Sequence, residues 1–158
     1  MTRFVGDHLP EDLYQRLAGR HLSAHAEKAI LVCTVDAGGW PHPALLSYFE
    51  VVAKDERNIR LATYKDSSTT NNMRRNGKLT ILIVDKRIAY YLKGTAEELV
   101  REMNSSPHNS KLNFRLEQVL ADEANEEYEP GVYLTSGVTY KRSADPHQAR
   151  ALIEELLV

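Results

Sequence analysis

The sequence predicts a mainly β fold with flanking helices, in which six antiparallel strands form a closed or nearly closed barrel. One observation is a series of short apolar or alternating runs, each of strand length. A second is that the tight turns "DAGG", "DERN" and "KR" join successive runs, which favours antiparallel hairpins. A third is that many short strands in one compact chain favour barrel closure, because closure removes exposed sheet edges.

Each predicted strand follows from its own pattern. "AILVCTV" is a continuous apolar run, typical of a buried strand, and "KLTILIVD" is rich in β-branched residues. "RIAYYLKGTAEEL" and "GVYLTSGVTYKR" alternate between apolar and polar side chains. Pro41 and Pro43 have no N–H for a ladder, so we expect them at the start or edge of their strand. The predicted strands are residues 29–35, 41–53, 59–64, 78–85, 87–99 and 131–142.

Four other segments have helical patterns. Pro10 and two acidic residues suit the first turn of one helix, and Gly77 suits the end of another. Leu112 and Leu116 lie four residues apart and would share one face of a third helix. Asp145 suits the N-cap of a terminal helix. The predicted helices are residues 10–20, 67–76, 112–123 and 145–158.

Composition limits the classes of function. The chain has 158 residues, of which 42% are hydrophobic and 27% charged, so we expect one globular domain over residues 1–158. Its net charge of -2 provides no general attraction for nucleic acid, and the short basic run at 74–78 suits the C-terminal end of a helix. No apolar stretch has the length of a signal peptide or a bilayer span, so we expect a cytoplasmic protein with no membrane partner.

Four consecutive hydroxyl side chains, Ser67 to Thr70, stand at the start of the helix predicted over 67–76. A helix N-terminus has unpaired backbone N–H groups and partial positive charge, so hydroxyl donors there suit a phosphate. Lys65, with Arg74 or Arg75, would add full charge. The alternative is plain N-capping, in which one hydroxyl accepts from the helix backbone and the others face water. The residues of this segment leave both interpretations open.

The sequence contains no pattern of a self-sufficient catalytic site. It has no nucleophile elbow, P-loop or dinucleotide-binding fingerprint, so the catalytic residues stay unknown. His21 and His25 are spaced for one helical face, but no third ligand stands nearby, so we predict a surface pair and no metal site. The chain therefore either takes its chemistry from a cofactor or is not an enzyme.

An ordered set of motifs resembles one known family. The set begins with the strand and turn "LVCTVDAGGWP", continues through "TYKDSSTTNNMRRN", and ends with "KGTAE" on the fifth strand. In this order the motifs resemble the pyridoxamine-5'-phosphate-oxidase-like, FMN-binding split-barrel family. The resemblance covers residues 28 to 99, close to half of the chain.

The resemblance implies a six-stranded split β-barrel that forms a homodimer with two FMN sites at the subunit interface. In such proteins the flavin lies along the second and third strands, and the loop and helix start after the third strand hold its phosphate. By position, the phosphate side is formed by Lys65, Ser67, Ser68, Thr69 and Asn72. The isoalloxazine side is formed by Leu45, Leu46, Ser47, Ala62 and Thr63.

The chain departs from the family pattern in two places. Many relatives have an Arg-Lys pair where this chain has Ser68 and Thr69, so the usual cationic clamp on the phosphate is absent. Neutral donors bind a phosphate less strongly than charged ones, so we expect modest FMN affinity. The substrate-binding arginine and histidine pattern of true pyridoxamine phosphate oxidases is also missing from the C-terminal segment. We therefore do not expect vitamin B6 oxidation.

The leading functional hypothesis is an FMN-dependent oxidoreductase that transfers electrons from a reduced nicotinamide or another donor to a small molecule. Alternatives are a non-catalytic flavin-binding stress or sensor protein, a haem- or deazaflavin-binding split barrel, and a dimeric scaffold without cofactor. For haem, His42 or His108 would be the axial ligand. Aromatic residues would either wall the substrate side or fill the core and the dimer interface. They are Trp40, Tyr48, Tyr64, Tyr90 and Tyr91.

Overall fold

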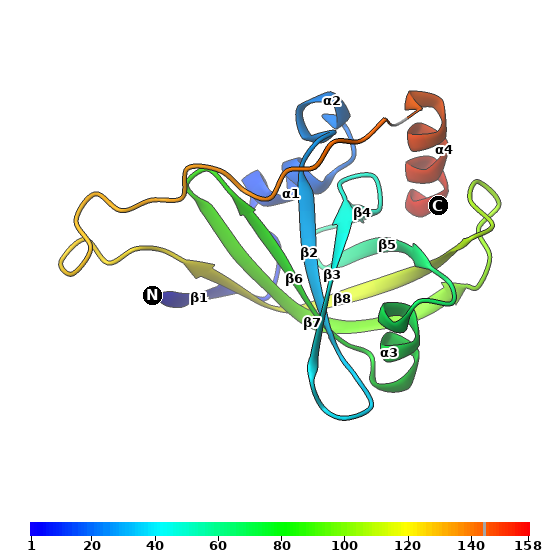
Figure 1. Ribbon diagram of the computed structural model, residues 1–158, viewed down its shortest axis with the longest axis horizontal. Helices are drawn as coiled ribbons and strands as arrows, with labels where there is room; N and C mark the ends of the chain where they lie inside the picture. The colour runs from blue at the N-terminus through cyan, green and yellow to red at the C-terminus, as the bar shows by residue number, and fades with distance from the viewer. Residues whose placement is uncertain (144) are drawn as a thin grey trace.

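The computed structural model describes residues 1–143 and 145–158, and Figure 1 shows a strongly twisted sheet with helices at its ends and sides. The helices are α1 (Glu11–Leu17), α2 (Leu22–His25), α3 (Ser68–Asn76) and α4 (Pro146–Leu157). The strands are β1 (Thr2–Gly6), β2 (Ala29–Val35), β3 (Pro41–Ser47), β4 (Val51–Ala53), β5 (Asn58–Tyr64), β6 (Lys78–Asp85), β7 (Ile88–Val100) and β8 (Asn109–Asp122). None of the described helices is long and apolar enough to cross a membrane.

The strands form one eight-stranded sheet in which every pairing is antiparallel. The order is β3-β2-β6-β7-β8-β5-β4, and β1 pairs with β8. Within the described residues β3 and β4 end the order without pairing to each other, so the curled sheet stays open between them. The predicted fold class, a mainly β antiparallel split barrel with flanking helices, is confirmed, although the sheet has more strands than the six predicted.

The core has two parts. The larger one fills the inside of the sheet with fully buried side chains such as Ile30, Leu61 and Phe114. α1 closes this core with Leu13 and Leu17, which lie four residues apart and are both buried. The smaller one lies between α4 and the strands β4 and β5, and its members are Phe49, Val52, Ala62, Met103, Ala149, Leu152, Ile153 and Leu156. The terminal helix is therefore held against the β4 end of the sheet.

The segment predicted as a helix over 112–123 belongs to β8 up to Asp122. Leu112, Phe114 and Leu116 are all buried, which is the two-residue period of a strand with one face on the core. Leu112 and Leu116 are four residues apart, and this spacing fits both a helical face and every second residue of a strand. The buried Phe114 between them fits the strand, because in a helix it would not share a face with Leu112 and Leu116.

The strand predicted over 131–142 is also wrong. This segment forms no strand, and its ladder contact with the sheet is the single bridge between Lys28 and Thr139. Backbone hydrogen bonds from Ala29 to Val138 and from Tyr140 to Glu27, each 2.9 Å, fix its path. Figure 1 shows that the chain leaves β8 as a long arm, residues 123–134, and then returns across the molecule to α4.

Other boundaries differ less. The long strand predicted over 41–53 is divided into β3 and β4 by a turn at residues 48–50. β1 and the short α2 lie in segments for which the sequence predicted no element. The helices predicted over 10–20, 67–76 and 145–158 are present as α1, α3 and α4, with slightly shorter bounds.

A polar cluster joins α1 and α2 to the sheet. Asp85, which is buried at the end of β6, accepts hydrogen bonds from Arg16 Nη1 at 2.9 Å and Lys28 Nζ at 2.5 Å. Burial alone would raise the pKa of Asp85, but the hydrogen bonds from Lys28, the Lys86 backbone and Arg16 lower it well below its usual range. His25 stacks on Tyr48 with ring centroids 4.5 Å apart.

Candidate functional site

A cavity of about 530 Å³ opens between β3, β5, the N-terminal end of α3 and the segment that precedes α4. It is within the size range of small-molecule and cofactor sites. Six residues of the predicted flavin site line it: Leu45, Leu46, Ser47, Thr63, Ser67 and Thr69. The structure therefore brings together residues from both the predicted phosphate side and the predicted isoalloxazine side.

The other four predicted residues do not line this cavity. Ala62 is fully buried in the smaller core, and the buried Asn72 donates to Thr34 Oγ1 at 2.9 Å. Lys65 lines a neighbouring open recess, together with Tyr64, Asp66, Ser67 and His108. Ser68 is exposed to solvent.

Two members of the hydroxyl cluster hold the start of α3 in place. Ser67 is the N-cap, and its Oγ accepts from the Thr70 backbone N–H at 3.2 Å. Thr70 Oγ1 donates to the Tyr64 carbonyl oxygen at 2.7 Å and lies 2.6 Å from Thr63 Oγ1. The capping interpretation is therefore correct for Ser67, and Thr70 fixes the end of β5 to the helix.

Thr69 differs from its neighbours in the cluster. Its side chain is only 6% exposed and lines the cavity, and its hydroxyl has no hydrogen-bond partner within residues 1–143 and 145–158. Over the same residues the backbone N–H groups of Ser68 and Thr69 have no acceptor, as expected in the first turn of a helix. This end of the cavity therefore offers hydrogen-bond donors and the positive end of a helix dipole.

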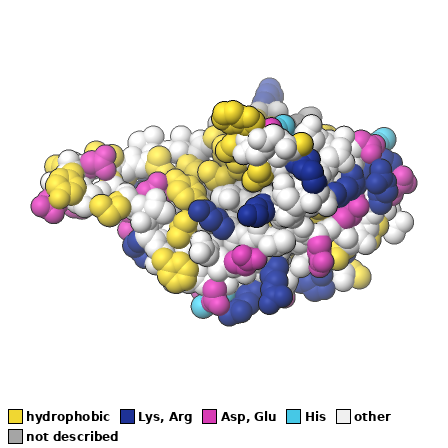
Figure 2. Space-filling view, turned by 90° about the horizontal axis from the view of Figure 1, so that it is seen from below, with side chains coloured by type: hydrophobic (Ala, Val, Ile, Leu, Met, Phe, Trp, Pro, Cys, Tyr) yellow, Lys and Arg dark blue, Asp and Glu magenta, His cyan; other side chains and the backbone are white. Residues whose placement is uncertain are grey.

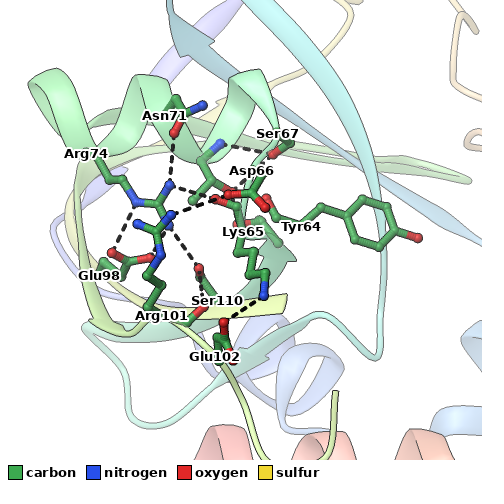
Figure 3. Close-up of polar contacts among 12 residues, drawn as sticks. Tyr64, Lys65, Asp66, Ser67, Asn71, Arg74, Glu98, Arg101, Glu102 and Ser110 are labelled. Atoms are coloured by element: carbon green, nitrogen blue, oxygen red, sulfur yellow. Dashed lines mark hydrogen bonds and ion pairs between the residues drawn. The ribbon is translucent and has the colours of Figure 1, made fainter. Parts of the chain in front are cut away.

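The basic side chains around this helix start are paired with carboxylates, as Figure 3 shows. Lys65 Nζ lies 2.8 Å from Glu102 Oε1, and Arg101 Nη2 lies 3.4 Å from Asp66 Oδ1. Arg74 forms an ion pair with Glu98, and its hydrogen bond lowers the pKa of that carboxyl.

Neither arginine of α3 lines the cavity. Arg74 faces Glu98 and Ser110 on the strands behind the helix, as Figure 3 shows, and Arg75 donates to the Val35 carbonyl oxygen at 2.8 Å. Tyr64 points away from these polar contacts toward the cavity that it lines.

Four residues that the sequence did not assign to the site also line the cavity: Ala44, Glu50, Tyr140 and Arg142. Glu50 Oε2 accepts from the Ser47 backbone N–H at 2.7 Å and from Ser47 Oγ at 2.8 Å. Arg142 Nη1 lies 3.2 Å from the Tyr140 hydroxyl and 3.9 Å from Glu50 Oε2. No motif marks Tyr140 or Arg142, because they reach the cavity only through the path of the segment after the arm.

A second cavity, of about 240 Å³, adjoins the first and shares Glu50, Tyr64 and Arg142 with it. It extends toward α4 and is also lined by Ser105 and His108. Tyr64 is thus the one residue of the five aromatic candidates that lines either cavity in the described structure. Tyr48 is buried against His25, while Trp40, Tyr90 and Tyr91 lie elsewhere.

Two comparisons of structure agree on the fold. A candidate pyridoxamine 5'-phosphate oxidase from Lactobacillus delbrueckii has a TM-score of 0.60 at 17% identity, over 75% of this chain and 98% of its own. An FMN-binding protein from Syntrophomonas wolfei has a TM-score of 0.55 at 15% identity, over 72% of this chain and 88% of its own. At these identities the likeness shows the fold alone.

Sequence comparisons go further. The chain is 31% identical over 130 residues to the uncharacterised protein YclD of Bacillus subtilis (strain 168). The matched residues make up 82% of this chain and 81% of YclD. The sequence model of the pyridoxamine 5'-phosphate oxidase family matches residues 21–128, well over half of the chain and beyond the 28–99 that carried the resemblance. The chain therefore belongs to the pyridoxamine 5'-phosphate oxidase family.

Proposed function

We propose that the cavity between β3, β5 and α3 binds FMN, and that the chain is an FMN-dependent oxidoreductase acting on a small molecule. One observation carries this proposal: a single cavity has anion-binding donors at one end and apolar strand residues at the other. The donors are the hydroxyl and the backbone N–H of Thr69, neither of which has a partner among the described residues. The apolar wall is formed by Ala44, Leu45 and Leu46 on β3.

The residues present fit such a ligand. Phosphates bind readily at helix N-termini, and the donors there point to an anion rather than to a neutral group. The β3 wall offers the apolar surface that an aromatic ring system requires. Ser47 beside it is held by Glu50 in two hydrogen bonds, so its hydroxyl is fixed in the cavity wall.

Bound FMN would supply the redox chemistry, and the protein would supply binding and orientation. Leu45 and Leu46 would position the ring, while Thr69 and the start of α3 would anchor the phosphate. Family membership and the fold shared with the FMN-binding protein of Syntrophomonas wolfei support this choice of cofactor. Four predicted residues do not line the cavity. Of these, the buried Ala62 and Asn72 would support the surrounding structure, while Ser68 and Lys65 would contribute from outside the cavity.

We also propose that the chain works as a homodimer in which a second copy covers the open side of this cavity. Large apolar side chains stand exposed around it: Leu45 is 59% exposed and Tyr64 68%. Elsewhere on the surface the arm exposes Tyr128, Val132 and Tyr133, and Figure 2 shows hydrophobic side chains gathered on the arm. Exposed apolar patches of this kind favour protein–protein contact.

The experiment is a spectral one. Protein purified without added cofactor, and again after addition of FMN and gel filtration, should show flavin absorbance bands at one FMN per chain. Anaerobic addition of a reduced nicotinamide should then bleach the flavin, and reoxidation by a small acceptor should restore it. If the flavin binds but is never reduced, the proposed oxidoreductase activity is wrong and the chain is a flavin-binding protein. A Soret band, or no retained flavin, would contradict the FMN proposal.

A further inference from the structure

We infer that Arg142 is the cation that meets the phosphate of the bound nucleotide, in place of the Arg-Lys pair that Ser68 and Thr69 do not supply. This inference rests on the proposed function and adds a residue to it. Among the described residues that line the cavity, Arg142 is the one with a positive charge. It comes from the segment after the arm, outside the part of the chain that matches the family model.

The other cations near the start of α3 are already engaged. Lys65 is paired with Glu102 and Arg101 with Asp66, as Figure 3 shows, and none of the four lines the cavity. Arg74 is held by four partners, namely Glu98, Asn71, Ser110 and the Lys65 carbonyl group. Moving any of these to a ligand would leave a carboxylate without its partner.

Arg142 is held differently. Its only carboxylate partner among the described residues is Glu50, at 3.9 Å, which is at the limit for an ion pair. Glu50 Oε2 already accepts two hydrogen bonds from Ser47, so the carboxylate stays hydrogen-bonded if Arg142 turns away from it. Exchanging Glu50 for a phosphate therefore leaves no buried group unpaired, and the charge-assisted hydrogen bonds to the phosphate are shorter and stronger than the contact that is lost.

The guanidinium is also positioned in advance. The Tyr140 hydroxyl lies 3.2 Å from Arg142 Nη1, and the guanidinium carbon lies 5.3 Å from the centre of the Phe49 ring. The backbone on the N-terminal side is fixed to the sheet by the Tyr140–Glu27 hydrogen bond and the Lys28–Thr139 bridge. Binding therefore does not have to order a loose tail, which would cost conformational entropy.

The negative charge of Glu50 is a second reason why the loss of Arg142 should weaken FMN binding. A carboxylate in the same cavity opposes an anionic ligand, and Arg142 offsets that charge. Removing the arginine would leave Glu50 and the phosphate facing each other without a cation among the lining residues. The loss of FMN affinity should therefore exceed that expected from one hydrogen bond. This loss should depend on the phosphate of the ligand and not on its ring system.

The test compares FMN with riboflavin, which has the same ring system and no phosphate. Dissociation constants for both ligands are measured by flavin fluorescence for the unaltered protein, Arg142→Gln, Arg142→Lys and the control Arg101→Gln. We expect Arg142→Gln to weaken FMN binding by roughly tenfold or more and riboflavin binding by less than about twofold. Arg142→Lys should recover part of the loss, and Arg101→Gln should change neither constant.

Two further measurements keep the outcome clear. Glu50→Gln, which keeps an acceptor for Ser47, should bind FMN severalfold more tightly. The salt dependence of FMN binding should become weaker in Arg142→Gln, because one cation no longer takes part. Equal losses for FMN and riboflavin, or an unchanged FMN constant, would overturn the inference while leaving the FMN site intact. If the unaltered protein binds neither flavin, the proposed function fails, and the assignment of Arg142 fails with it.

Discussion

Arg74 Nη1 lies 2.6 Å from the Lys65 carbonyl oxygen, so the last turn of α3 is tied to the loop that precedes the helix. The same guanidinium forms an ion pair with Glu98 on β7. The sequence suggested Arg74 as a charge for the phosphate, but its contacts make it the residue that holds the loop in shape. The position of the donors at the start of α3 depends on this contact.

We expect Arg74→Met to lower the free energy of unfolding by about 2 kcal/mol, because it leaves Glu98 and the Lys65 carbonyl group without a charged donor. The measurement is urea unfolding followed by circular dichroism. Arg75→Met is the matched control on the next residue, which is exposed and donates to Val35 and Asn72. Equal stability of Arg74→Met and the unaltered protein would show that the ion pair does not hold the loop.

The hydroxyl cluster gives a second prediction. Thr69→Val keeps the shape of the side chain but removes the donor that lines the cavity, so FMN binding should weaken by about 2 kcal/mol, roughly thirtyfold. Ser68→Ala should change it little, because Ser68 is exposed and outside the cavity lining. Titration with FMN measures both. A larger loss in Ser68→Ala than in Thr69→Val would place the phosphate on the outer side of the helix instead.

Asp85 and its two cations carry a prediction about stability. Asp85→Asn should lower the free energy of unfolding by about 3 kcal/mol, because the largely buried Arg16 and Lys28 lose their shared carboxylate. Asp7→Asn is the control, since the Asp7–Arg57 pair is exposed on both sides and should contribute little to stability. Chemical unfolding of the two variants in parallel distinguishes them, and similar losses would contradict the assignment.

His25 predicts how stability depends on pH. Burial, followed by the charges of Arg16 and Lys28, lowers the pKa of His25 to about 4, whereas the unfolded chain titrates near 6.5. Between these values the unfolded state binds more protons, so stability is full above pH 6.5 and falls as the pH drops toward 4. After a discount for partial exposure, the loss should be about 2 kcal/mol.

His25→Phe keeps a ring on Tyr48 and removes the titration, so its stability should change less between pH 6.5 and 4 than that of the unaltered protein. Thermal melts across this range measure the difference. The lowered pKa of Asp85 acts at still lower pH, where both proteins should lose stability together. Parallel pH profiles down to pH 4 would show that His25 is not the group responsible.

Local patterns in the sequence were enough to predict most of the fold. β2 and α3 occur where apolar runs, capping residues and Gly77 predicted them, because these signals act within a few residues. β8 was misassigned because leucines four residues apart satisfy two periods at once. The segment over 131–142 alternates like a strand, yet its first residues belong to the arm and it meets the sheet in a single bridge.

The candidate site could be predicted only in part. Leu45, Ser47, Thr63 and Thr69 were placed by the ordered motifs of the family, and the structure brings them to one cavity. The pairing of Lys65 with Glu102 could not be read from the sequence, because it joins distant segments through tertiary structure. The same holds for Arg142, whose place beside Glu50 depends on how the chain returns from the arm.

The most direct measurement is a crystal structure of the protein grown with FMN. We predict density for the phosphate within hydrogen-bond distance of the Thr69 hydroxyl and the first N–H groups of α3, with the flavin ring against Leu45 and Leu46. A well-ordered structure at saturating FMN with this cavity empty, or with the flavin bound elsewhere, would contradict the account.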